Sequence, residues 1–259
     1  MSNPKKPTDM GTNKTGIATS PLESKKTIEG AREGSPARSF DVASIEAVRL
    51  SQSSVAEPVG TMPPPGSLKG VVKSGIEAVK GHNPMVLLDL IGDRLAFERT
   101  GVRLYEAMFA KLEAAERPDR GPAREDVRQI RDEELQHVGL LIQAMEELGG
   151  DPTAVTPTAD ICAVAGTGIL KVLTDPRATL THALHAVHIA ELADNDAWGM
   201  LADLAEAMGH EEMAANFRQA LLDEERHLEY VRTWLTADLE AQAGIESTLP
   251  STEPTIVAP

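Results

Sequence analysis

Apolar residues recur at spacings of three, four and seven along four stretches of the chain, and this spacing is typical of amphipathic helices. The stretches run from about Pro84 to Glu116, Pro122 to Leu148, Ala178 to Met208 and Glu211 to Ala241. Helices of this size extend roughly 40–50 Å at a rise of 1.5 Å per residue. Four of them predict an all-α protein, an antiparallel four-helix bundle whose apolar stripes share one core.

The segments between these helices carry turn signals. Proline and glycine separate the first two helices, and Gly209-His210 separates the last two. Residues 150–177 form a long connection, in which we predict a short helix at Ala165–Leu173. One connection must traverse the bundle in such folds, so this crossover would join the second and third helices.

The composition changes outside the bundle, which we place at residues 84–241. Residues 1–66 are rich in Lys, Ser, Thr, Gly and Pro and poor in large apolar residues. Such a segment buries too little surface to offset its chain entropy, so we expect a disordered tail with a short helix near Val42–Ser51. Residues 67–83 predict a short amphipathic connector, and residues 242–259 a flexible tail.

Six polar residues lie on the apolar stripes, where core side chains are expected. Four of them form two Glu-x-x-His pairs, and the other two are lone glutamates upstream of each pair. Residues three apart share a helix face, so each pair aims a carboxylate and an imidazole at one point. The candidate metal ligands are Glu98, Glu134, His137, Glu191, Glu224 and His227.

The spacing of these residues repeats along the chain. Glu98 precedes Glu134 by 36 residues, and Glu191 precedes Glu224 by 33. Each lone glutamate is followed seven residues later by an aromatic residue, Tyr105 in one case and Trp198 in the other. We interpret this as a duplicated helical hairpin in which each copy supplies half of one site.

Charge favours metal ions at this site. Four buried carboxylates would repel one another, and their pKa values would rise. Two divalent cations offset four negative charges and leave two neutral imidazoles as donors, which is the inventory of a di-iron or di-manganese site. The alternative is a bundle that has lost or never filled such a site.

These motifs carry a resemblance to a known family. Residues 84–240 resemble the ferritin-like superfamily, which includes bacterioferritins, rubrerythrins and manganese catalases. The stretch LADLAEAMGHEEMAANFRQALLDEERH is also similar to a bacterial ferritin-like family typified by a stress-associated protein. The chain departs from the rubrerythrin pattern in one respect, because the electron-transfer module of rubrerythrins needs paired Cys-x-x-Cys motifs and this chain has the single Cys162.

The resemblance implies a role for each candidate ligand. It implies that Glu98 and Glu191 are terminal ligands and that Glu134 and Glu224 bridge the two metals. The two histidines would complete the coordination spheres. Two Fe ions are the cofactor it implies, with two Mn ions as the alternative, because both metals accept carboxylate and imidazole.

Several neighbours of the candidate ligands have two interpretations. Tyr105 either hydrogen-bonds near the metals or packs in the core, and Arg226 either offsets the ligands' charge or is solvated. Asp194, one turn after Glu191, is a candidate to hold a ligand histidine in place. Glu133 adjoins a bridging candidate, but a one-residue step rotates it off the stripe.

Composition limits the partners. The net charge is −15, and residues 81–240 carry 14 basic and 30 acidic side chains, a net −16. A strongly acidic domain argues against nucleic-acid binding, which needs a basic patch.

No apolar run is long enough for a membrane span and the N-terminus lacks a secretory signal, so we expect a cytoplasmic protein without a membrane partner. One cysteine fits a reducing compartment.

Two classes of function follow. The first is a redox enzyme in stress protection that oxidises Fe(II) or reduces oxygen or peroxide at a dinuclear centre. The second is non-catalytic, either iron sequestration or a structural stress protein with a vestigial site. Metal ions, with oxygen or peroxide, are the expected partners, and a homodimer remains open.

A short segment before the bundle offers a further partner. Residues 65–69 (PGSLK) resemble the Gly-Ser-Leu-basic core of peptides that load ferritin-like cargo into encapsulin shells. The alternative is a turn into the amphipathic connector, with Leu68 packing on the bundle.

Overall fold

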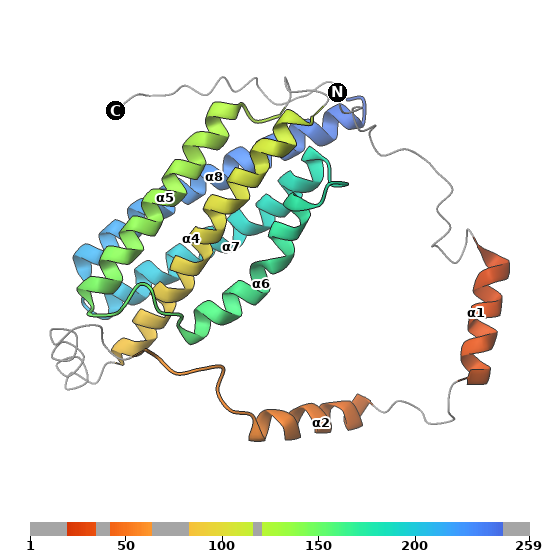
Figure 1. The fold of residues 1–259 in the computed structure, drawn as a ribbon, viewed down its shortest axis with the longest axis horizontal. Coiled ribbons are helices and arrows are strands. Elements are labelled where there is room, and N and C mark those ends of the chain that lie inside the picture. Colours follow the sequence, from red (N-terminus) through yellow and green to blue (C-terminus); the bar gives the residue numbers. More distant parts are fainter. Residues whose placement is uncertain (1–19, 35–41, 64–82, 116–120, 246–259) are drawn as a thin grey trace. The chain divides into compact units, whose positions relative to one another are not determined.

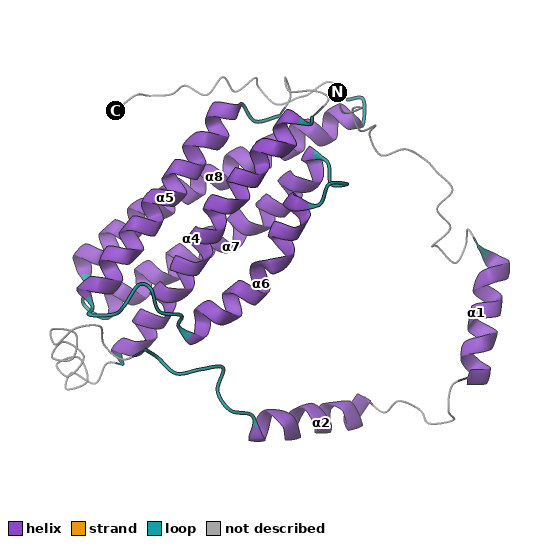
Figure 2. Cartoon of the chain, viewed as in Figure 1, coloured by secondary structure: helices purple, strands orange, loops and turns teal. Residues whose placement is uncertain are grey.

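The computed structural model describes residues 20–34, 42–63, 83–115 and 121–245. Within these ranges the regular elements are α-helices (Figure 2). Their bounds are α1 Pro21–Gly34, α2 Val42–Val55, α4 Pro84–Glu113, α5 Arg124–Glu147, α6 Pro157–Thr174, α7 Leu180–Ala207 and α8 Glu211–Gln242. Helices α4, α5, α7 and α8 form the bundle, and α6 lies along it (Figure 1).

Two helices precede the bundle. The short helix predicted near Val42–Ser51 corresponds to α2, whereas α1 had no counterpart among the predicted elements. None of the residues of α1 is buried, so this helix adds nothing to the hydrophobic core. The predicted connector at 67–83 and the segment at 65–69 lie outside the described residues, apart from Asn83.

The two apolar clusters of the core show the direction of each helix. One contains the start of α4 and α8 and the end of α5 and α7, with Leu87, Leu141, Leu201 and Phe217 among its members. The other contains the opposite ends, with Leu104, Ile130, Leu184 and Val231. Helices α4 and α8 are therefore parallel, α5 and α7 run against them, and the link from α5 to α7 must return along the bundle. This arrangement confirms the predicted all-α bundle with one long crossover.

Local sequence signals place the ends of the bundle helices. Asn83 caps α4 by accepting a hydrogen bond from the Met85 amide (3.1 Å), and Pro84 occupies the first turn, where its missing N–H is not needed. Helix α7 ends at Ala207 with Met208 as its cap, and it is followed by Gly209, whose φ of +81° favours glycine. The Gly209 amide donates to Glu206 O (2.8 Å), and the His210 amide donates to Ala205 O (2.9 Å), which closes the helix end.

The crossover contains a longer helix than the predicted Ala165–Leu173, because α6 begins at Pro157. Asp89 of α4 anchors the start of α6 by accepting from the Thr158 amide (2.9 Å) and hydroxyl (2.6 Å). At the other end the buried Lys111 of α4 donates to the carbonyls of Asp175 (2.6 Å) and Ala178 (3.0 Å). Helix α6 is thus held against α4 at both ends, and it also packs on α7.

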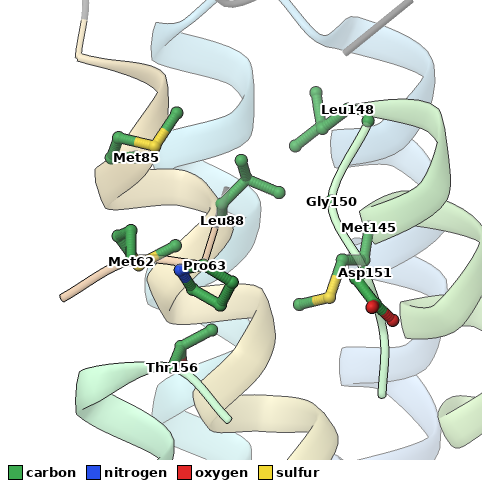
Figure 3. Close-up of a pocket in the computed structure, with 10 residues that line it drawn as sticks. Met62, Pro63, Met85, Leu88, Met145, Leu148, Gly150, Asp151 and Thr156 are labelled. Carbon is green, nitrogen blue, oxygen red and sulfur yellow. The ribbon is translucent and has the colours of Figure 1, made fainter. Parts of the chain in front are cut away.

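A small apolar pocket lies at one end of the bundle (Figure 3). Met62 and Pro63 line it together with residues of α4 and α5, among them Met85 and Met145. None of the six candidate ligands lines this pocket, so it is separate from the polar layer described below. Among the described residues, no helix is both long and apolar enough to span a membrane.

Because Asp89 is the side-chain anchor of the α6 N-terminus, we expect Asp89→Ala to lower the free energy of unfolding by about 1–2 kcal/mol. The loss should be measurable by denaturant unfolding, and amide exchange should accelerate in α6. Glu106→Ala, at an exposed position of the same helix, is the control and should leave both measurements near wild type. Unchanged exchange in α6 would show that this contact does not anchor the crossover.

Candidate metal centre

The six candidate ligands form one polar layer between the two apolar clusters. Each is at most 4% exposed, and Glu98, Glu224 and His227 are completely buried. They divide into two groups whose potential ligand atoms lie within 4.8 Å of one another, Glu98/Glu134/His137/Glu224 and Glu134/Glu191/Glu224/His227. The two groups share Glu134 and Glu224.

Both imidazoles present Nδ1 to the cluster. His137 Nδ1 lies 2.8 Å from Glu224 Oε1 and 3.6 Å from Glu98 Oε2. His227 Nδ1 lies 3.2 Å from Glu224 Oε2 and 3.6 Å from Glu134 Oε1. Glu224 therefore faces one histidine with each oxygen, which places this carboxylate between the two groups.

Several carboxylate oxygens in the layer are buried without a hydrogen-bond partner among the described residues. They are Glu98 Oε2, Glu134 Oε2 and Glu191 Oε2. Buried oxygens of this kind are unfavourable unless they are paired or bound to a cation. Their convergence with two imidazole nitrogens fits a pair of divalent metal ions, so the cluster is able to hold metal.

Burial and mutual repulsion perturb the pKa values of the acids. Burial, followed by the charges of Glu224 and Glu98, raises the pKa of Glu134 well above its usual range. Burial and the Glu224 charge raise the pKa of Glu191 to about 8. Burial acts in the same direction on Glu224, but hydrogen bonds from His137 and His227 outweigh it and lower its pKa to about 2. The layer thus balances its charge by distributing protons, a role that cations also fill.

Gly101 provides the room for Glu134. A Cβ atom at position 101 of α4 would come within 2.3 Å of Glu134 Oε2 and 2.9 Å of its Cδ. No side chain fits there unless the Glu134 carboxylate moves. This glycine, three residues after Glu98, therefore allows α5 to present Glu134 to the centre of the layer.

Two aromatic residues fix the lone glutamates in a reciprocal manner. Tyr105 of α4 donates its hydroxyl hydrogen to Glu191 Oε1 on α7. Trp198 of α7 donates its Nε1 hydrogen to Glu98 Oε1 on α4, at 2.9 Å. The aromatic residue seven positions after each lone glutamate thus holds the glutamate of the other hairpin. Tyr105 therefore does both things considered for it: its hydroxyl hydrogen-bonds to Glu191 and its ring packs in one of the two apolar clusters.

The histidines are also held reciprocally. Glu133 Oε2 of α5 lies 2.8 Å from His227 Nε2 on α8, and Asp223 Oδ2 of α8 lies 3.6 Å from His137 Nε2 on α5. Arg226 joins the two acids, at 2.9 Å from each. An acid on the outer nitrogen orients a ligand histidine and keeps Nδ1 free for the metal.

Two sequence interpretations are corrected here. Asp194 does not hold a histidine; its carboxylate pairs with the buried Arg94 of α4, one turn before Glu98. Glu133 does have a partner at the site. A repeated sequence feature could have indicated this role. An acid directly precedes the glutamate of each Glu-x-x-His pair, Glu133 before Glu134 and Asp223 before Glu224.

A four-helix bundle around a buried carboxylate–histidine layer is the architecture of ferritin-like proteins. The family model described as rubrerythrin matches residues 89–235, more than half of the chain. The chain therefore belongs to the rubrerythrin family, and the resemblance to the ferritin-like superfamily is confirmed. Comparisons with curated proteins and with solved structures gave no match.

Gly101→Ala should weaken metal binding because the added methyl group displaces the Glu134 carboxylate. We expect the affinity for Co(II), measured by the visible absorption of the bound ion, to fall by about 10–100-fold. Changes to residues that support metal ligands typically have effects of this size. Gly139→Ala is the matched control, since a Cβ there meets nothing within 4 Å. Equal affinities in the two variants would exclude Gly101 as the residue that positions Glu134.

Removing the acids behind the histidines should also weaken metal binding. We expect Glu133→Gln and Asp223→Asn each to reduce metal affinity by about 10–100-fold while the fold is retained. Glu225→Gln, at the exposed neighbouring position of α8, is the control. Isothermal titration with Co(II) would measure these affinities, and a control variant as weak as the other two would point to overall charge as the cause.

Proposed function

We propose that this protein is a di-iron oxidoreductase that oxidises Fe(II) with oxygen or peroxide and so acts in protection against oxidative stress. The observation that carries the proposal is the pair of ligand groups that share Glu134 and Glu224. Membership of the rubrerythrin family supports iron as the metal. Two iron ions bound by these groups would supply the electrons that reduce the oxidant.

In this proposal the six side chains divide into three kinds of ligand. Glu134 and Glu224, which belong to both groups, would bridge the two ions. Glu98 and Glu191 would each bind one ion, held in place by Trp198 and Tyr105. His137 and His227 would bind through Nδ1, because their Nε2 atoms face Asp223 and Glu133.

The surrounding residues would protect the reaction. The apolar clusters on both sides of the polar layer exclude bulk water from the ligands. The Tyr105 hydroxyl donates a hydrogen bond to Glu191. Burial raises the pKa of Tyr105 well above its usual range, so the hydroxyl keeps its proton. Fixed donors of this kind keep the carboxylates oriented while their charge changes.

Metal content and oxygen consumption together test the proposal. Protein purified without chelators should contain about two iron ions per chain, and anaerobic protein loaded with Fe(II) should consume oxygen or peroxide on mixing. Glu134→Ala and Glu224→Ala should lose most of the metal and the consumption. His185→Ala, at an exposed position of α7, should keep both.

The other outcomes are equally informative. Loss of metal in the His185 variant to the same degree as in the Glu134 variant would contradict the ligand assignment. Two irons without oxidant consumption would favour sequestration over catalysis. Two manganese ions with peroxide disproportionation would replace iron by the manganese alternative.

A further inference from the structure

The seam between α5 and α8 is the least closely packed side of the wall around the polar layer. Helices α4 and α5 pack closely as one hairpin, and α7 and α8 as the other, while α6 covers the side of α4 and α7 (Figure 1). In the described part of the chain, α5 and α8 approach each other less closely than these pairs do. An ion that comes to the layer from solvent therefore meets the least packing between α5 and α8.

A group of three charged side chains fills this seam. Glu133 comes from α5, and Asp223 and Arg226 come from α8. A single nitrogen, Arg226 Nη2, lies 2.9 Å from Glu133 Oε1 and 2.9 Å from Asp223 Oδ1. One cationic atom is thus held between two carboxylates, in a place where a divalent cation would find the same oxygen ligands.

The remaining oxygens of the two acids face the layer. Glu133 Oε2 lies 2.8 Å from His227 Nε2, and Asp223 Oδ2 lies 3.6 Å from His137 Nε2. His137 Nε2 is buried and has no hydrogen-bond partner among the residues that the structure describes. Each acid therefore has one oxygen at Arg226 and the other at a candidate ligand, so the two acids connect the partly exposed seam to both ligand groups.

Arg226 is the part of this group that can move. Its side chain is 35% exposed, and partly exposed ion pairs hold their members weakly. Its Nε is buried without a hydrogen-bond partner in the described ranges, so the side chain gains little from its present position apart from the two acids. A divalent cation that displaced it would bring two positive charges to these acids in place of one.

We propose that metal ions enter and leave the polar layer between α5 and α8 by way of Glu133 and Asp223, and that Arg226 controls the rate by occupying this route. The proposal rests on the metal-binding part of the proposed function and not on its redox chemistry. Arg226 must move aside for an ion to pass in either direction. It therefore slows binding and release to a similar degree and leaves the affinity nearly unchanged.

The kinetics of Co(II) binding test this proposal. Stopped-flow mixing of the full-length protein with Co(II), followed by visible absorption, gives the binding rate, and transfer of bound Co(II) to excess EDTA gives the release rate. We expect Arg226→Gln to accelerate both by about tenfold, because a hydrogen bond between charged groups corresponds to at least that factor. The amount of Co(II) bound per chain should equal that of the wild type, which shows that the layer is intact.

Two further variants separate control of the route from a general effect of charge. Arg232→Gln removes the same charge from an exposed position of α8 and should bind and release Co(II) at wild-type rates. Arg226→Lys can still place a cationic nitrogen near the two acids and should restore most of the slow kinetics.

The opposite results would overturn the proposal. Equal rates in the Arg226→Gln and Arg232→Gln variants would show that ions do not pass Arg226. Faster binding of Co(II) by Arg226→Gln with unchanged release would show that Arg226 only repels cations and thereby lowers the affinity. A wild-type protein that binds no Co(II) would contradict the metal centre itself, whereas the first two results would leave the centre standing and exclude only the route.

Discussion

The burial of four carboxylates in one layer is the constraint on which the rest of this structure depends. An ionised carboxylate in an apolar interior is unfavourable by several kcal/mol unless it is paired, hydrogen-bonded or bound to a cation. Two apolar clusters hold the helices together on either side of the layer. Within the layer, Tyr105, Trp198 and the two histidines supply donors to the acids. These donors leave oxygens without partners, and metal ions are the remaining compensation.

The donors cross from one helical hairpin to the other. Tyr105 and Trp198 link α4 to α7, while Glu133 and Asp223 link α5 to α8. Each hairpin therefore supports the ligands of the other hairpin. A single hairpin would present its acids without the groups that orient them. The site is consequently complete only when both hairpins have packed, which couples assembly of the bundle to assembly of the centre.

The periodicity of apolar residues was sufficient to predict the bundle and to predict that the six polar residues converge in its core. A carboxylate on an apolar stripe must point into the core. The periodicity could not identify contacts that depend on how neighbouring helices are rotated. Glu133 is rotated about 100° from Glu134 on its own helix, yet it reaches His227 because α8 lies beside α5 at that level. Gly101 belongs to no sequence pattern, and its role is seen only in the structure, where an added Cβ would lie 2.3 Å from Glu134 Oε2. Arg94 and Asp194 pair across 100 residues.

The layer is enclosed unequally on its different sides. On the side of α4 and α7, the crossover helix α6 covers the bundle and is anchored by Asp89 and Lys111. On the side of α5 and α8, the Glu133, Asp223 and Arg226 side chains are 17%, 26% and 35% exposed. Solvent therefore comes nearest to the histidines at this ion-paired group, where the barrier is made of charged side chains that can rotate. The proposed function would need both a dry interior and contact with soluble metal and oxidant. This division suits it, since the apolar crossover keeps one side closed and the charged side remains accessible.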